Sequence, residues 1–150
     1  MEKQMLTVSA QEMVWQFMAK HNFTIGLREF PDCLETRFLW QQVGNVRASL
    51  IAEELAEFCA AWAKGDMVEI ADAIGDLLYV VHGAAVNAGI PAAAMQAVFE
   101  EIQASNMTKT PGSGKRGGDK PRGEDYRPPD IRGVLAKFNC LKRFKEGSAT

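Results

Sequence analysis

Apolar residues recur at helical spacing along most of this chain of 150 residues. The clearest stripe consists of residues that follow one another at steps of four, three and four, namely Ile51, Leu55, Phe58 and Trp62. Such steps return to one face of a helix, and no stretch carries a strand pattern of substance. We therefore expect an all-α fold with helices over about residues 9–21, 36–64, 66–87, 91–107 and 131–144.

Local signals mark where several of these helices begin and end. Ser9 followed by Glu12 has the spacing of a capping box, and Asp66 followed by Glu69 has the same spacing. Gly65 is a typical stop signal between the two longest predicted helices, and so short a turn makes those helices antiparallel. The inner face of the first predicted helix is expected to hold Met13, Phe17 and Met18.

Between residues 77 and 99 the sequence has no charged side chain. A helix that is apolar all round is buried on more than one side, which a small monomer hardly achieves. We therefore expect the helical bundle to be completed by association of several copies of the chain.

The length and the hydrophobic fraction of 47% suit a single domain, residues 1–150, with a core of its own. Residues 110–129 are predicted to form a Gly/Pro-rich basic loop, followed by a short C-terminal helix. The three cysteines lack CxxC spacing, and the first residues do not have the pattern of a signal peptide. No run reaches the roughly 18 apolar residues of a membrane span. These features favour a cytoplasmic protein without a membrane partner.

The formal net charge of −2 gives no reason to expect a specific nucleic-acid partner, but it hides an asymmetry. Residues 51–76 hold seven acidic side chains and one basic one, which sum to −6. Residues 109–145 hold eleven basic side chains and four acidic ones, which sum to +7. The acidic segment is therefore either a functional cluster or an ordinary solvated helix face.

Six carboxylates lie near the predicted turn on two neighbouring helices: Glu53, Glu54 and Glu57 on the first, and Glu69, Asp72 and Asp76 on the second. Steps of three and four place neighbours on one helix face, where like charges repel. Bound cations remove this repulsion, and ligands that are all oxygen favour Mg²⁺ or Mn²⁺. Zinc and di-iron sites are not indicated, because no histidine or cysteine cluster accompanies the carboxylates. Glu69 has a competing role as the partner of a cap at Asp66.

The order of these motifs resembles the signature of a known superfamily. Glu-Glu-x-x-Glu at residues 53–57, followed by Glu-x-x-Asp at residues 69–72, is similar to the MazG-like all-α nucleoside triphosphate pyrophosphohydrolases. Residues 72–81 are similar to the second metal-binding helix of that superfamily. Ser-Asn-Met-Thr-Lys at 105–109 and Tyr-Arg-Pro-Pro-Asp-Ile at 126–131 further resemble its phosphoribosyl-ATP pyrophosphohydrolase-like, or Cof-like, branch. The resemblance covers roughly residues 10–135.

The resemblance implies a MazG-like helical bundle, assembled as a homodimer or homotetramer. It implies Mg²⁺-dependent hydrolysis of a nucleoside triphosphate to the monophosphate and pyrophosphate, in house-cleaning or nucleotide-pool control. The metal ligands that it implies are Glu54, Glu57, Glu69, Asp72 and Asp76, with Glu53 as a further ligand or as the base for water.

One position departs from the superfamily pattern. Many members carry Glu three residues before the Asp that precedes Leu-Leu, and here that position is Ala73. Either Glu69 and Asp72 form the pair on the second helix, or Asp72 and Asp76 do and Glu69 is peripheral. We favour Asp72 and Asp76, together with Glu54 and Glu57, as the ligand core.

Outside the carboxylates, Asn106 and Lys109 are the expected substrate contacts, and Tyr126 is a candidate for stacking on a base or for packing within the loop. Arg47 precedes the Glu cluster and is expected to orient a carboxylate or, as the commoner outcome, to form an exposed ion pair. Two other functions stay open: a catalytically weak protein that binds or senses nucleotides, and a structural bundle in which the acidic helix pairs with the basic segment. The base and sugar of the nucleotide are left open.

Overall fold

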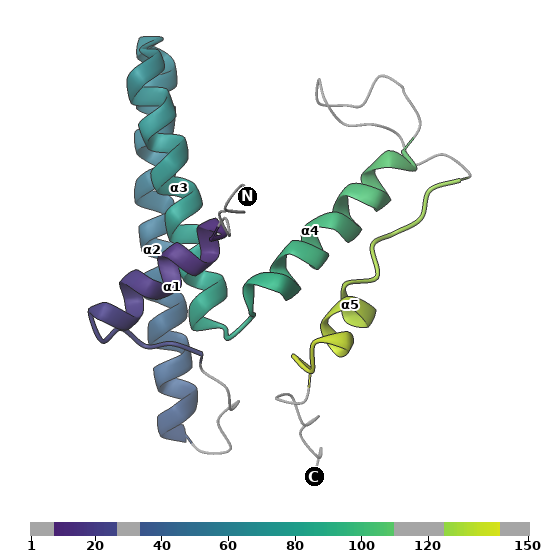
Figure 1. Ribbon diagram of the computed structural model, residues 1–150. Coiled ribbons are helices and arrows are strands. Elements are labelled where there is room, and N and C mark those ends of the chain that lie inside the picture. The colour runs from purple at the N-terminus through teal and green to yellow at the C-terminus, as the bar shows by residue number, and fades with distance from the viewer. Residues whose placement is uncertain (1–7, 27–33, 110–124, 142–150) are drawn as a thin grey trace, which may run out of the picture. The chain divides into compact units, whose positions relative to one another are not determined.

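The computed structural model describes residues 8–26, 34–109 and 125–141, and this part of the chain is built from helices and turns without a strand. The all-α prediction is therefore confirmed. The helices are α1 (Ala10–Lys20), α2 (Leu34–Lys64), α3 (Met67–Asn87), α4 (Ala92–Met107) and α5 (Ile131–Lys137), as Figure 1 shows. They fall into two compact units, which divide between Ala92 and Ala93. The prediction of one domain over residues 1–150 stays a prediction.

In the first unit, α1 begins with the capping box that the sequence predicts. The backbone N–H of Glu12 donates to Ser9 Oγ at 3.3 Å, and the N–H of Ser9 donates to Glu12 Oε2 at 2.8 Å. The predicted inner face of α1 is correct for Met18, which packs with Val14 and Val86. It is wrong for the other two predicted residues, because α1 turns its 14/18 edge towards α3 and leaves Met13 and Phe17 54% and 43% exposed.

The two longest helices, α2 and α3, form an antiparallel hairpin and lie side by side in Figure 1. Gly65 supplies the left-handed turn with φ of +71°, and its N–H donates to the carbonyl of Ala61 at 3.1 Å. Asp66 then caps α3, since its carboxylate accepts from the N–H of Val68 at 2.8 Å. The small residues Ala61 and Ala73 pack between the helices and let them approach closely. The turn thus fixes the register of α2 against α3.

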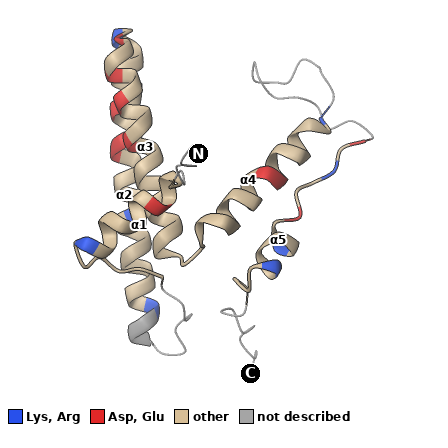
Figure 2. Cartoon of the chain, viewed as in Figure 1, with Lys and Arg blue, Asp and Glu red and all other residues tan. Residues whose placement is uncertain are grey.

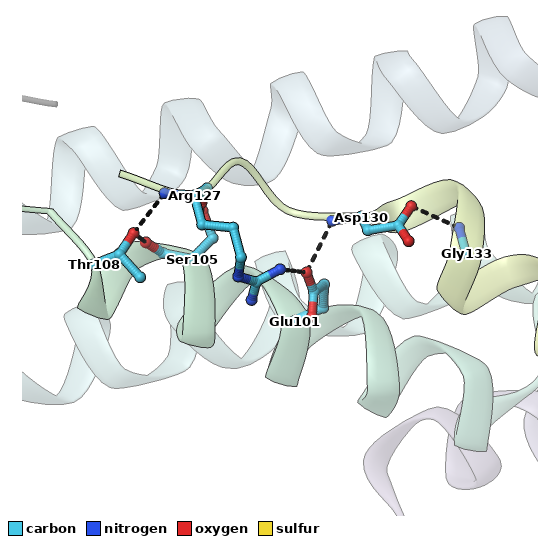
Figure 3. A network of polar contacts seen from close by, with 6 residues as sticks. All are labelled: Glu101, Ser105, Thr108, Arg127, Asp130 and Gly133. Atoms are coloured by element: carbon cyan, nitrogen blue, oxygen red, sulfur yellow. Dashed lines mark hydrogen bonds and ion pairs between the residues drawn. The ribbon is translucent and has the colours of Figure 1, made fainter. Parts of the chain in front are cut away.

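In the second unit, the segment that leads into α5 is fastened to α4 by polar contacts (Figure 3). Glu101 on α4 accepts a hydrogen bond from the Arg127 guanidinium and another from the N–H of Asp130, at 2.8 Å. Asp130 in turn caps α5 by accepting from the N–H of Gly133 at 2.8 Å. Helix α5 begins at Ile131 as predicted and ends before the predicted residue 144.

Within the described residues, no single helix combines the length and the apolar character that crossing a membrane requires. In the same residues, α3 and α4 reach that length and composition as a pair that is bent at the break between them.

Candidate metal and nucleotide site

The α2–α3 hairpin brings the acidic residues of the two helices to the same part of the first unit. Glu54 precedes Gly65 by eleven residues and Asp76 follows it by eleven, so the two occupy matching levels of the antiparallel pair. Figure 2 shows the acidic positions gathered along the part of the hairpin nearest its turn. The two helices are antiparallel because only a short turn separates the end of α2 from the start of α3.

Glu54, one of the six carboxylates of the predicted site, has its pKa shifted by this arrangement. It is half-buried, whereas Glu53, Glu57, Asp72 and Asp76 are exposed. Burial raises the pKa of Glu54, and the charges of Glu57, Asp76, Glu53 and Asp72 raise it further, in that order. Two of these charges come from α3 and two from α2. The hairpin therefore concentrates negative charge from both helices around one carboxylate, and an arriving cation is attracted to that point.

Glu69 lies elsewhere on the hairpin. Its carboxylate makes an ion pair with Lys64 across the turn, with Nζ and Oε2 2.7 Å apart, and its backbone N–H donates to the Asp66 cap at 3.3 Å. Glu69 does not contribute to the pKa shift of Glu54. Of the two α3 pairs that the sequence left open, Asp72 with Asp76 is the one whose two members both act on Glu54.

Ala73, the position that departs from the superfamily pattern, is 5% exposed and packs in the core with Ala61 and Ile70. A carboxylate at this position would point into the apolar contact between α2 and α3, where a charge is costly. The neighbouring positions 72 and 76 are exposed instead. Helix α3 therefore turns position 73 towards α2, where a small apolar side chain fits, and leaves positions 72 and 76 exposed.

The carboxylate side chains do not yet converge on one point. Among the residues that the structure describes, no group of three or more His, Cys, Asp or Glu side chains is close enough to hold a metal ion. The hairpin brings the charges of the two helices near enough to act on Glu54, but these side chains do not form a shared coordination sphere in this structure. The chemistry of the set, which is all oxygen, fits Mg²⁺ or Mn²⁺.

Among the residues that the structure describes, Arg47 does not form the exposed ion pair that the sequence suggested. It is half-buried, and Nε donates a hydrogen bond to Oδ1 of Asn87 at the end of α3, while Nη2 contacts the Met18 sulfur at 3.6 Å. Burial lowers the pKa of Arg47. Asn87 also donates to the carbonyl of Thr24, so it links Arg47 to the segment after α1. Sequence reasoning missed Asn87, although an amide within the charge-free stretch was the available signal.

The two motifs that resemble the phosphoribosyl-ATP branch meet in the second unit (Figure 3). Ser105 Oγ donates to the carbonyl of Arg127 at 2.8 Å, and the N–H of Arg127 donates to Thr108 Oγ1 at 3.0 Å. The substrate contacts predicted in these motifs lie beside this network: Asn106 is exposed, whereas Lys109 and Tyr126 are half-buried. Their roles stay predictions, as do the contributions of the loop residues 110–124, which lie outside the described residues.

Comparison with known proteins found a family model whose match includes the α2–α3 hairpin. The family model of phosphoribosyl-ATP pyrophosphohydrolase matches residues 35–106, which contain α3 and nearly all of α2 and α4. All six carboxylates of the predicted site lie within the matched span. A search among curated proteins found no match. Residues 35–106 are therefore similar to the phosphoribosyl-ATP pyrophosphohydrolase family, which is part of the MazG-like all-α nucleoside triphosphate pyrophosphohydrolase superfamily.

Proposed function

We propose that the protein is a Mg²⁺-dependent nucleotide pyrophosphohydrolase that converts a nucleoside triphosphate and water to the monophosphate and pyrophosphate. The observation that carries this proposal is the half-buried carboxylate of Glu54, whose pKa is raised first by burial and then by four other carboxylates from α2 and α3. Repulsion of this kind is relieved by a divalent cation. The match to a pyrophosphohydrolase family supports hydrolysis that releases pyrophosphate as the reaction in which the cation takes part.

Glu54, Glu57, Asp72 and Asp76 are the residues that would hold the metal. When bound, Mg²⁺ supplies charge neutralisation for the polyphosphate and lowers the pKa of a coordinated water. Glu53 is exposed on α2, where its charge also raises the pKa of Glu54, and it is the proposed base, which accepts a proton from the attacking water. A new bond forms between the water oxygen and phosphorus, the anhydride bond between the α and β phosphates breaks, and pyrophosphate leaves.

We also propose that the enzyme is a cytoplasmic homodimer or homotetramer. The support is the apolar surface that the hairpin leaves uncovered in one chain, including Trp62 and Leu78, which are 63% and 54% exposed. Sedimentation velocity measures the assembly directly. A monomer at micromolar concentration would contradict this part of the proposal, whereas a dimer or tetramer that dissociates in a Leu78→Glu variant would support it.

The enzymatic proposal is tested by incubating the purified protein with Mg²⁺ and each common ribonucleoside and deoxyribonucleoside triphosphate, and measuring released pyrophosphate. We expect release from at least one nucleotide, its loss in Glu54→Gln, and full retention in Glu100→Gln. Glu100 is a matched control because it is an exposed glutamate in the other unit, where it accepts from Gln96 at 2.9 Å.

Two outcomes would overturn the proposal. One is the absence of pyrophosphate release from every nucleotide above the level of Glu54→Gln. The other is release that persists in the presence of a chelator. Tight Mg²⁺-dependent nucleotide binding without turnover would instead identify a protein that senses or sequesters nucleotides.

A further inference from the structure

The first unit contains two adjoining cavities at the end of the hairpin remote from its turn. Their volumes are about 180 and 140 Å³, and both are lined by Val43, Arg47 and Asn87. Phe23 adds an aromatic wall to the larger cavity and Trp40 to the smaller one. An apolar protein cavity of about 150 Å³ is large enough to bind benzene. Each cavity therefore has the size of one six-membered ring.

The guanidinium of Arg47 gives these cavities a polar recognition group. One of its five N–H donors is used on Asn87, and another contacts the Met18 sulfur, which is a weak acceptor. Among the described residues, the ion pairs are those of Lys64 with Glu69 and of Arg127 with Glu101, so Arg47 has no carboxylate partner there. A half-buried cation with donors to spare favours a ligand that brings a hydrogen-bond acceptor.

The side chain of Asn87 fixes where that guanidinium lies. Its amide is used on both sides, accepting from Arg47 Nε and donating to the Thr24 carbonyl. On the facing helix surface, Gly83 gives the guanidinium room, because a Cβ there would lie 2.5 Å from Arg47 Nη1. Arg47 is thus held in place before any ligand arrives, which reduces the entropy lost on binding.

The cavities lie on the same faces of the hairpin as the carboxylates. Arg47 precedes Glu54 by seven residues and Gly83 follows Asp76 by seven, which is two helical turns in each case. The separation along the helix axis is about 10 Å. A ligand whose phosphates lie at the carboxylates therefore extends along one side of the hairpin to bring its other end to Arg47.

We propose that Arg47, positioned by Asn87, binds a carbonyl oxygen of a pyrimidine base whose nucleotide phosphates occupy the carboxylate site. This inference rests on the proposed function, which it extends to the base. The guanidinium is a donor only, so it matches a carbonyl oxygen, which uracil and cytosine carry and adenine lacks. The size of each cavity favours the single ring of a pyrimidine.

The test measures binding of mononucleotides, which requires no turnover. Deoxyuridine monophosphate, deoxycytidine monophosphate, deoxyadenosine monophosphate and ribose 5-phosphate are titrated with Mg²⁺ into the wild-type protein while tryptophan fluorescence is followed. We expect the two pyrimidine nucleotides to bind about tenfold more tightly than the adenine nucleotide and ribose 5-phosphate. A Trp40→Phe variant should lose most of the fluorescence change, because Trp40 lines the smaller cavity.

Arg47→Lys keeps the charge but not the planar donor group, and we expect it to lose the tenfold preference. Arg37→Lys is the matched control, because Arg37 is an exposed arginine on the same helix. Equal wild-type affinities for all four ligands, or an unchanged preference in a folded Arg47→Lys protein, would overturn this inference. Because the wild-type comparison needs no variant, poor folding of Arg47→Lys leaves the test intact. Absent pyrophosphate release together with a pyrimidine preference that depends on Arg47 would overturn the proposed function alone.

Discussion

Gly83→Ala is the substitution whose effect follows most directly from the structure. An added Cβ would lie 3.0 Å from Cζ of Arg47 and 2.5 Å from its Nη1, and the second distance is shorter than such atoms approach one another. The guanidinium must therefore move, although its hydrogen bond to Asn87 and its half-buried position restrain it. The hydrogen bond between Arg47 and Asn87 is the contact that this movement is expected to break.

Two opposing contributions set the size of the effect. Replacing a helix-interior glycine by alanine stabilises the helix by about 1 kcal/mol. Loss of a hydrogen bond made by a charged group costs about 1.5–3 kcal/mol. The free energy of unfolding of Gly83→Ala should therefore fall by about 0.5–2 kcal/mol. Gly75→Ala is the control, because no heavy atom lies within 4 Å of its added Cβ, and it should gain about 1 kcal/mol.

Urea denaturation followed by far-ultraviolet circular dichroism measures both variants. Two further proteins, Arg47→Ala alone and Arg47→Ala with Gly83→Ala, complete the comparison, because alanine at 83 should stabilise the protein once the guanidinium is gone. Equal stabilisation by Gly83→Ala and Gly75→Ala in the wild-type background would refute the placement of Arg47 against Gly83.

Three further predictions concern the charged residues. Mg²⁺ should raise the melting temperature of the wild-type protein and leave that of Asp76→Asn unchanged in a thermal scan; equal shifts in both would contradict a metal role for Asp76. The raised pKa of Glu54 means that the folded protein holds this proton more tightly than the unfolded chain, so the stability contribution falls as pH rises from 4.5 through the raised value. Without metal, Glu54→Gln should accordingly be more stable than wild type at neutral pH and lose that advantage in acid, and a lower stability at neutral pH would argue against clustered charges. The hydrogen bond from Arg127 lowers the pKa of Glu101, so its stabilising contribution is present above pH 4.5 and is lost as pH falls through the lowered value. Glu101→Gln should speed amide exchange in residues 127–133 at neutral pH, and unchanged exchange would show that Glu101 does not hold this segment on α4.

The helical fold could be predicted from the sequence because its signals are local. Ser9, Gly65 and Asp66 act within a few residues of themselves, and the structure places helix ends where these residues stand. The inner face of α1 was harder to predict, because Met13 and Phe17 are as apolar as the residues that are buried. Which face of α1 is buried depends on how the helix is rotated against α3, and helical periodicity does not specify that rotation.

The acidic part of the candidate site was predictable for a similar reason. The spacing of Glu54 and Asp76 about Gly65 specifies their facing positions once the turn is known. The contact between Arg47 and Asn87 joins residues 40 positions apart, so no local pattern announces it. The sequence left two pairs open on the second helix, one with Glu69 and one without it, and it did not predict the ion pair of Glu69 with Lys64, which depends on side-chain conformations across the turn.

The identity of the phosphorus products tests the central claim most directly. Phosphorus nuclear magnetic resonance, applied to a nucleoside triphosphate incubated with the protein and Mg²⁺, separates pyrophosphate with monophosphate from orthophosphate with diphosphate. We predict pyrophosphate and nucleoside monophosphate in equal amounts from the wild-type protein, and unreacted triphosphate from Glu54→Gln. Orthophosphate as the primary product, or the same products at the same rate from Glu54→Gln, would contradict a pyrophosphohydrolase site between α2 and α3.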